Sequence, residues 1–228
     1  MQQDIRLTET EARLIGALLE KEITTPDQYP LSLNALKLAC NQKTSRDPVM
    51  SLTDEQVQDT LDALRRKHLV LERSGFGSRV PKFKQRFCNT EFSSLQFTEQ
   101  ERGVVCALLL RGPQTPGQLR TNTHRLCEFA DVTKVEQTLQ NLIHRSDGPF
   151  VARMSREAGK REFRFRELFS EGAAHPEQES PVDMEAAGDA PRSPPEEPDR
   201  VADLEQRVAL LEAEIEAIRR RVFPEPFE

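Results

Sequence analysis

The first 170 residues of this chain contain the same pattern twice, and this repeat restricts the fold to a tandem of two related domains. A Thr-Glu-x-Glu motif at Thr8 recurs 90 residues later at Thr98. Further along, the offset falls to 78 residues, so that Thr60 matches Thr138. The difference of 12 residues indicates that the first copy carries an insertion within residues 41–52. We therefore predict one domain over residues 5–90 and a second over residues 95–169.

Each copy is predicted to contain three helices followed by two strands. The repeated motif is a capping box, in which the threonine side chain accepts a backbone N–H and the glutamate bonds back to the threonine backbone. The second helix is expected to begin at Ser32 and at Thr115, and the third helix after Thr53 and after Asp131. This order is that of a winged helix-turn-helix, so the fold class is mainly α with small β hairpins.

Side chains of two kinds alternate along the last strand of each copy, which is the period of two expected for a half-buried strand. In the first copy the inward set is Pro81, Phe83, Gln85 and Phe87, and the outward set is Lys82, Lys84 and Arg86. In the second copy Phe163 and Phe165 alternate with Arg164 and Arg166. The outward face of both hairpins is therefore predicted to be basic.

Several stretches of the sequence are distinctive. They include LLEKEITTPDQYPLS from Leu18, CNQKTSRDPVM from Cys40, QRFCN from Gln85 and LLRGPQTPGQLR from Leu109. With these stretches the chain resembles the YceH family of uncharacterised bacterial proteins over about residues 5–170. The resemblance implies a fold of tandem winged-helix domains, and it implies no activity, cofactor or binding residue.

The net charge of −6 is divided unevenly along the chain. Residues 1–170 hold 26 basic and 22 acidic residues, whereas residues 171–228 hold 6 basic and 16 acidic residues. Residues 170–199 are rich in proline and glutamate and show no apolar periodicity. Because such a segment cannot bury enough apolar surface to offset its ordering entropy, we expect it to be a disordered linker.

A heptad pattern over residues 200–222 predicts a C-terminal coiled-coil helix. Its apolar positions, three and four residues apart, are Val201, Leu204, Val208, Leu211, Ile215, Ile218 and Val222. β-Branched residues at the first heptad position and mostly leucine at the fourth favour a parallel pair of helices, and the flanking charges attract across that pair. We expect a homodimer. The alternatives are packing of this helix onto its own chain and pairing with another protein.

Basic residues concentrate on the two hairpins and predict contact with the phosphates of double-stranded DNA. Residues 64–88 contain eight basic residues and one acidic residue, and residues 143–166 contain seven and three. The insertion and the third helix of the second copy add further polar candidates. The candidate nucleic-acid-binding residues are Lys43, Arg46, Arg65, Arg66, Arg73, Lys82, Lys84, Arg86, Lys134, Gln137, Lys160, Arg161, Arg164 and Arg166.

Two observations oppose sequence-specific DNA binding. The third helix of the first copy carries four carboxylates, at Asp54, Glu55, Asp59 and Asp62, which would repel a polyanion. Outward cations on a strand can also serve only to prevent edge-to-edge pairing. Two function classes therefore stay open: a non-enzymatic DNA-associated protein such as a transcriptional regulator, and a protein–protein adaptor that uses the same grooves without nucleic acid.

The sequence contains no motif of a catalytic or cofactor site. It has no GxSxG, P-loop, GxGxxG or HExxH pattern, so we expect neither an enzyme nor a cofactor. His124 and Cys127 supply too few ligands for a metal, and the four sparse cysteines suit a reduced core. The longest apolar run, from Val104 to Leu110, is too short to span a membrane, and no signal peptide precedes the first motif. We expect a cytoplasmic protein.

Overall fold

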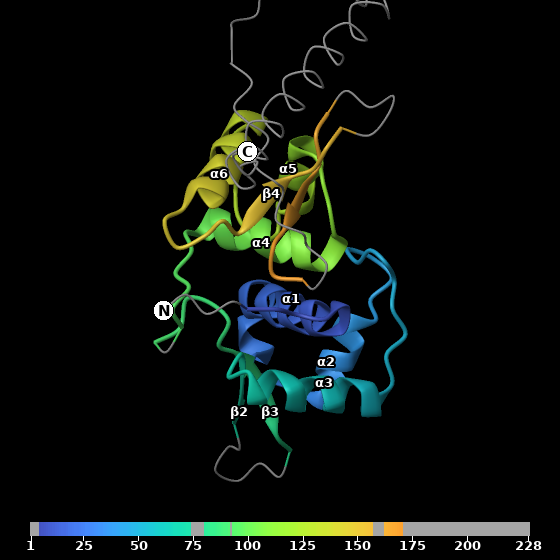
Figure 1. The fold of residues 1–228 in the computed structure, drawn as a ribbon. Helices are drawn as coiled ribbons and strands as arrows, with labels where there is room; N and C mark the ends of the chain where they lie inside the picture. Colours follow the sequence, from blue (N-terminus) through green and yellow to red (C-terminus); the bar gives the residue numbers. More distant parts are fainter. Residues whose placement is uncertain (1–4, 74–79, 92, 157–161, 171–228) are drawn as a thin grey trace, which may run out of the picture. The chain divides into compact units, whose positions relative to one another are not determined.

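The computed structural model describes residues 5–73, 80–91, 93–156 and 162–170, which belong to the first of the two units into which the chain divides, residues 1–179. This part of the chain holds six α-helices and two small antiparallel sheets (Figure 1). The predicted linker from residue 171 onward and the predicted coiled coil lie outside the described residues.

The first copy contains the three helices and two strands predicted from the sequence, together with a 3-10 turn and a short strand that were not predicted. Its elements are α1 (Glu9–Thr24), the 3-10 turn η1 (Pro26–Gln28), β1 (Leu31–Ser32), α2 (Leu33–Cys40), α3 (Asp54–Arg66), β2 (Val70–Arg73) and β3 (Lys82–Gln85). The side chains of Thr8, Ser32 and Thr53 accept the capping hydrogen bonds of the three helices, which confirms the predicted starts. Strand β3 lies between β1 and β2 and is antiparallel to both.

The second copy repeats the order of three helices and two strands, without the insertion and, among its described residues, without elements like η1 and β1. Its elements are α4 (Glu99–Arg111), α5 (Pro116–Asn122), α6 (Val132–His144), β4 (Val151–Arg153) and β5 (Phe165–Glu167). Thr98, Thr115 and Asp131 cap the three helices, as the sequence predicts. Strand β5 pairs with β4 on one side and forms an isolated bridge with Gln114 on the other.

The alternation predicted for the first hairpin is confirmed for most of its length. Phe83, Gln85 and Phe87 are buried, while Lys82 is exposed. Pro81 is also exposed, so its predicted inward orientation is wrong. Pro81 precedes the first residue of β3 and therefore does not follow the pleat of the strand.

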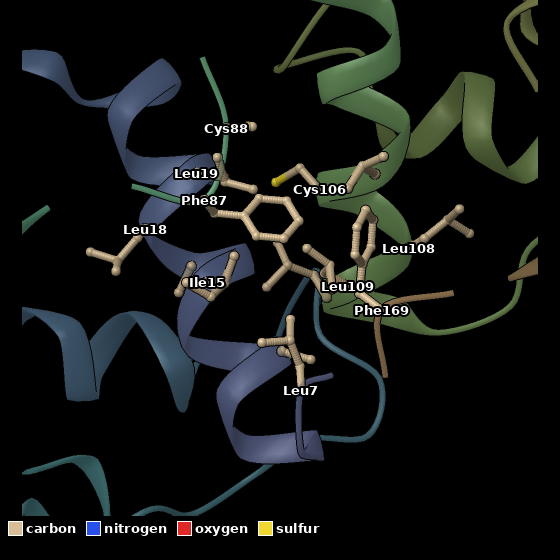
Figure 2. Close-up of a cluster of buried hydrophobic side chains, with 14 of the residues drawn as sticks. Leu7, Ile15, Leu18, Leu19, Phe87, Cys88, Cys106, Leu108, Leu109 and Phe169 are labelled. Carbon is tan, nitrogen blue, oxygen red and sulfur yellow. The ribbon is translucent and has the colours of Figure 1, made fainter. Parts of the chain in front are cut away.

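The two copies share one hydrophobic core, at the centre of which α1 packs against α4 (Figures 1 and 2). Every residue of α1 from Glu11 to Glu20 is buried, and α4 is buried almost as completely. In an isolated small domain, such a helix would keep one face exposed to solvent. Burial on all sides therefore requires the second copy. Phe87 from the first copy and Phe169 from the second meet edge to face, with ring centroids 4.9 Å apart.

Candidate nucleic-acid interface

The first hairpin places two cations directly opposite each other. Arg73 at the end of β2 and Lys82 at the start of β3 are partners in the antiparallel register, and both side chains are exposed. Phe83, the next residue, is 2% exposed and fixes β3 so that Lys82 faces the solvent. Like charges at directly opposed positions destabilise a strand pair. This end of the hairpin is therefore a concentrated positive surface.

Lys82 does not lie on a free sheet edge. Its Cα partners are Arg73 on one side and Ser32 of β1 on the other, because β3 is the central strand. A lysine that only prevents edge-to-edge pairing belongs on an outer strand. The hypothesis that the hairpin cations only prevent edge-to-edge pairing therefore does not apply to Lys82.

The other cations predicted on α3 and the first hairpin differ in their exposure and in their ion-pair partners. Arg65 is engaged with two acids of its own copy, Asp62 at 3.2 Å and Glu72 at 3.0 Å. Arg66 is exposed next to it, at the C-terminal end of α3. Lys84 and Arg86 are half-buried. Among the cations of α3 and the β2–β3 hairpin, Arg66, Arg73 and Lys82 are thus exposed, whereas Arg65 is exposed but paired with acids.

The insertion does not place both of its cations on the surface. Lys43 is exposed, as expected. Arg46 has a fully buried side chain that contacts Glu20 at 2.6 Å and also donates to the backbone oxygen of Ala39 at 3.0 Å. The expectation that Arg46 contacts nucleic acid from a surface loop is corrected by this burial, because its guanidinium is already occupied inside the protein.

The acidic face of α3 is partly neutralised by its neighbours. Asp54 pairs with Lys37 of α2 at 2.8 Å, and Asp62 accepts from Arg65. Glu55 and Asp59 remain exposed. The electrostatic objection to DNA binding by the first copy is therefore weaker than the sequence indicates, although it is not removed.

The exposed face of α6 is polar and carries little net charge. Asp131 caps the helix by accepting from the backbone of Lys134 at 2.8 Å. The Lys134 ammonium donates to the Gln137 side chain at 3.0 Å, and Gln140 and Asn141 continue the exposed face. Amide side chains of this kind can read base edges in a groove. Of the two third helices, α6 is the better suited to DNA.

The second hairpin orders two arginines that lie outside the candidate set predicted from the sequence. Arg153 and Arg156 lie over the ring of Phe163, with guanidinium carbons 4.4 and 4.6 Å from the ring centroid. Both arginines are exposed, so cation–π contacts hold them without neutralising them. The high basic content of residues 143–166 was the only sequence signal for them. Arg164 and Arg166 are half-buried, and Lys160 and Arg161 lie outside the described residues.

Arg145, a half-buried arginine after α6, has a structural role. Arg145 donates two hydrogen bonds of 2.8 Å to Asp147 and contacts Glu101 at 3.2 Å. The hydrogen bonds from Arg145 hold the pKa of Asp147 below its ordinary value. Arg145 therefore holds the loop after α6 in place, and its guanidinium is already occupied by Asp147 and Glu101.

The cysteines carry no reactive chemistry. Cys40, Cys88, Cys106 and Cys127 are all free and buried. Burial raises the pKa of Cys40 and of Cys88 to about 12 and that of Cys127 to about 11. Their thiols are therefore protonated at neutral pH and are poor nucleophiles. Within the described ranges no group of three or more histidine, cysteine or acidic residues is arranged to hold a metal ion.

The helices within the described part of the chain include none long and apolar enough to cross a membrane.

Comparisons with known proteins agree on one family. A family model described as "Protein of unknown function, DUF480" matches residues 7–160. A UPF0502 protein of Shewanella pealeana is 54% identical over 214 residues, covering 94% of this chain and 99% of the relative. A UPF0502 protein of Saccharophagus degradans is 50% identical over 218 residues, covering 96% of each chain. With such coverage, the similarity extends beyond residue 170.

Proposed function

Because this chain belongs to the DUF480 family, whose description carries no activity, we propose from its surface chemistry that it is a non-enzymatic DNA-binding protein and a transcriptional regulator. In this proposal the two copies are winged helix-turn-helix modules whose hairpins contact the phosphates of duplex DNA. The chain acts in the cytoplasm, where its four free thiols stay reduced.

The opposed pair Arg73 and Lys82 carries the proposal. Its repulsion costs stability in the free protein, and Lys82 lies on the central strand β3, where protection of a sheet edge does not account for a lysine. A phosphate group between the two cations turns that repulsion into attraction. Contacts of this kind supply sequence-independent affinity with a steep salt dependence.

The second copy supports the proposal with a different surface. Arg153 and Arg156, ordered by Phe163, provide further phosphate contacts, while the amide-rich face of α6 provides groups for base edges. Sequence preference is therefore expected to come from α6 and general affinity from both hairpins. A C-terminal coiled coil over residues 200–222 would pair two such chains and raise their avidity.

A salt titration of duplex binding tests the proposal. Full-length protein is titrated into a fluorescently labelled duplex at several salt concentrations, and the logarithm of affinity is plotted against the logarithm of salt concentration. Arg73→Glu combined with Lys82→Glu is expected to reduce the slope by about 2, because each neutralised phosphate contributes about 0.9. Arg73→Lys combined with Lys82→Arg keeps both charges and is expected to keep the slope. Failure of the unaltered protein to bind duplex at low salt would refute the proposal.

A protein–protein adaptor is the second candidate function, and one feature favours it. Around α2 and α3, the exposed acids Glu55 and Asp59 occur on a copy that also exposes Leu38 by 62% and Val49 by 57%. Exposed acids and exposed apolar side chains on the same copy suit a basic, amphipathic protein segment better than DNA. Recovery of one stoichiometric partner that survives nuclease treatment, together with no duplex binding, would favour this function.

A further inference from the structure

The two copies are joined too tightly to reorient. A Cβ atom built at Gly16 of α1 would lie only 2.9 Å from side-chain carbons of Leu110 of α4, so the helices are in close contact at this point. The Cys106 thiol lies 3.5 Å from the Gly16 carbonyl oxygen. On another side of the core, the backbone N–H of Leu7 donates to the carbonyl of Phe169 at 2.8 Å. Close-packed contacts of this kind resist rotation.

The insertion adds a second connection between the copies. The backbone N–H of Asp47 donates to the carbonyl of Leu110 at 3.0 Å, and Arg111 donates to the Ser45 hydroxyl at 3.0 Å. Arg125 of the second copy approaches Glu20 of the first at 3.4 Å. The insertion is present only in the first copy, and these bonds reach across to the C-terminal end of α4. The insertion therefore holds the first copy in a fixed orientation against the second.

The proposed DNA surfaces lie on opposite sides of this rigid centre. Helix α3 packs against α1 and α2, whereas α6 packs against α4 and α5. The α1–α4 pair lies between them, with the β2–β3 hairpin on the side of α3 and β4 on the side of α6 (Figure 1). Because the centre is rigid, the tandem cannot fold both surfaces onto one short straight duplex.

Building on the proposed function, we infer that a single chain holds two separate duplex segments at once. The first surface, defined as Arg66, Arg73 and Lys82, contacts one segment, and the second surface, defined as Arg153, Arg156 and the exposed face of α6, contacts the other. The partner of this protein is thus a pair of duplexes or two distant parts of one long DNA molecule. Bridging arises within one chain and does not require the predicted dimer.

A two-duplex capture assay tests this inference on the full-length chain. Leu204→Asp combined with Leu211→Asp first removes the predicted coiled coil, and light scattering verifies that the protein is monomeric. One duplex is fixed to beads and a second, fluorescent duplex is added with the monomeric protein. We expect the beads to retain fluorescence, and we expect sedimentation in excess duplex to give two duplexes per chain.

Variants at each surface separate the possible results. In the monomeric background, Arg73→Glu with Lys82→Glu, or Arg153→Glu with Arg156→Glu, is expected to reduce captured fluorescence to background while binding to a single duplex persists. Capture that survives loss of either surface, or a stoichiometry of one duplex per chain, overturns the inference while leaving the proposed function intact. Absence of any duplex binding by the unaltered protein removes the proposed function and the inference together.

Discussion

Arg46 of the insertion and Glu20 of α1 form a buried two-pronged ion pair. The guanidinium donates to the two carboxylate oxygens at 2.6 and 3.3 Å, and the side chains are 0% and 3% exposed. Lys21 and Arg125 each approach the same carboxylate at 3.4 Å. One carboxylate thus connects α1, the insertion and the second copy.

Removing Arg46 is expected to destabilise the protein strongly. Arg46→Met leaves the buried carboxylate of Glu20 without its main partner, which typically costs about 3–5 kcal/mol in the free energy of unfolding. Urea denaturation of both proteins measures the difference. The double variant Arg46→Met with Glu20→Gln removes both charges and is expected to recover part of the loss. A loss below about 1 kcal/mol in the single variant would contradict a structural role for the pair.

The same pair predicts a stability loss in acid. Burial alone would raise the pKa of Glu20, yet the hydrogen bonds and charge of Arg46, with help from Lys21, hold it below the ordinary value. A lowered carboxyl pKa in the folded state adds stability that is fully present above the ordinary glutamate pKa of about 4.3 and is lost as pH falls below it. The unfolding free energy is therefore expected to fall more steeply below about pH 5 in the unaltered protein than in the double variant. Parallel pH profiles would count against it.

A methyl group at Gly16 is expected to disturb the contact between the copies. Gly16→Ala places a Cβ atom 2.9 Å from side-chain carbons of Leu110, and overpacking of this kind costs about 1–3 kcal/mol. Gly117→Ala in α5 is the matched control, because its nearest neighbouring atom would be 3.9 Å away. Thermal unfolding is expected to show a lower midpoint for the first variant only. Equal midpoints would mean that α1 and α4 separate easily.

The buried thiols are expected to resist alkylation until the protein unfolds. The raised pKa of Cys40 and Cys88, about 12 for each, leaves almost no thiolate at pH 8, and burial also blocks access. Intact mass spectrometry after iodoacetamide treatment is expected to show no adducts under native conditions and four in denaturant. Rapid native labelling of one cysteine would reveal a local opening that the packed core does not predict.

Lys82→Glu is expected to change folding stability and DNA binding in opposite directions. A carboxylate at this position faces Arg73 directly, and replacing repulsion with attraction is worth about 0.2–1 kcal/mol to a strand pair. The same change places a negative charge where a phosphate is proposed to bind. Lys82→Gln, which only removes the charge, is expected to give intermediate values of both. A variant that gains stability and binds duplex as well as the unaltered protein would show that the cation serves no nucleic acid.

Local sequence rules were sufficient for the elements themselves. The caps at Thr8, Thr53 and Asp131 depend on residues three positions away, so they could be found without knowing the fold. The alternation around Phe83 likewise marks a half-buried strand through its nearest neighbours. These signals located each helix start and the strands of the first hairpin, although the predicted inward orientation of Pro81 was wrong.

Local sequence rules could not predict which cations are buried in ion pairs and which are exposed. Arg46 and Arg66 look alike in sequence, yet Arg46 is buried against a carboxylate 26 residues earlier, and Arg66 is exposed. Arg145 likewise pairs with a residue far away in the sequence, Glu101, at a separation of 44 residues. Pairings over such distances depend on how helices pack, and no local pattern encodes them.

The sequence by itself determined a duplicated unit of three helices and a hairpin, because periodicity and caps act over a few residues. Only the tertiary structure decided that the two units share a core through α1 and α4, and that the insertion joins them. The physical reason is that an apolar helix face shows only that it must be buried. Which partner buries it depends on shape complementarity between segments about 90 residues apart in the chain.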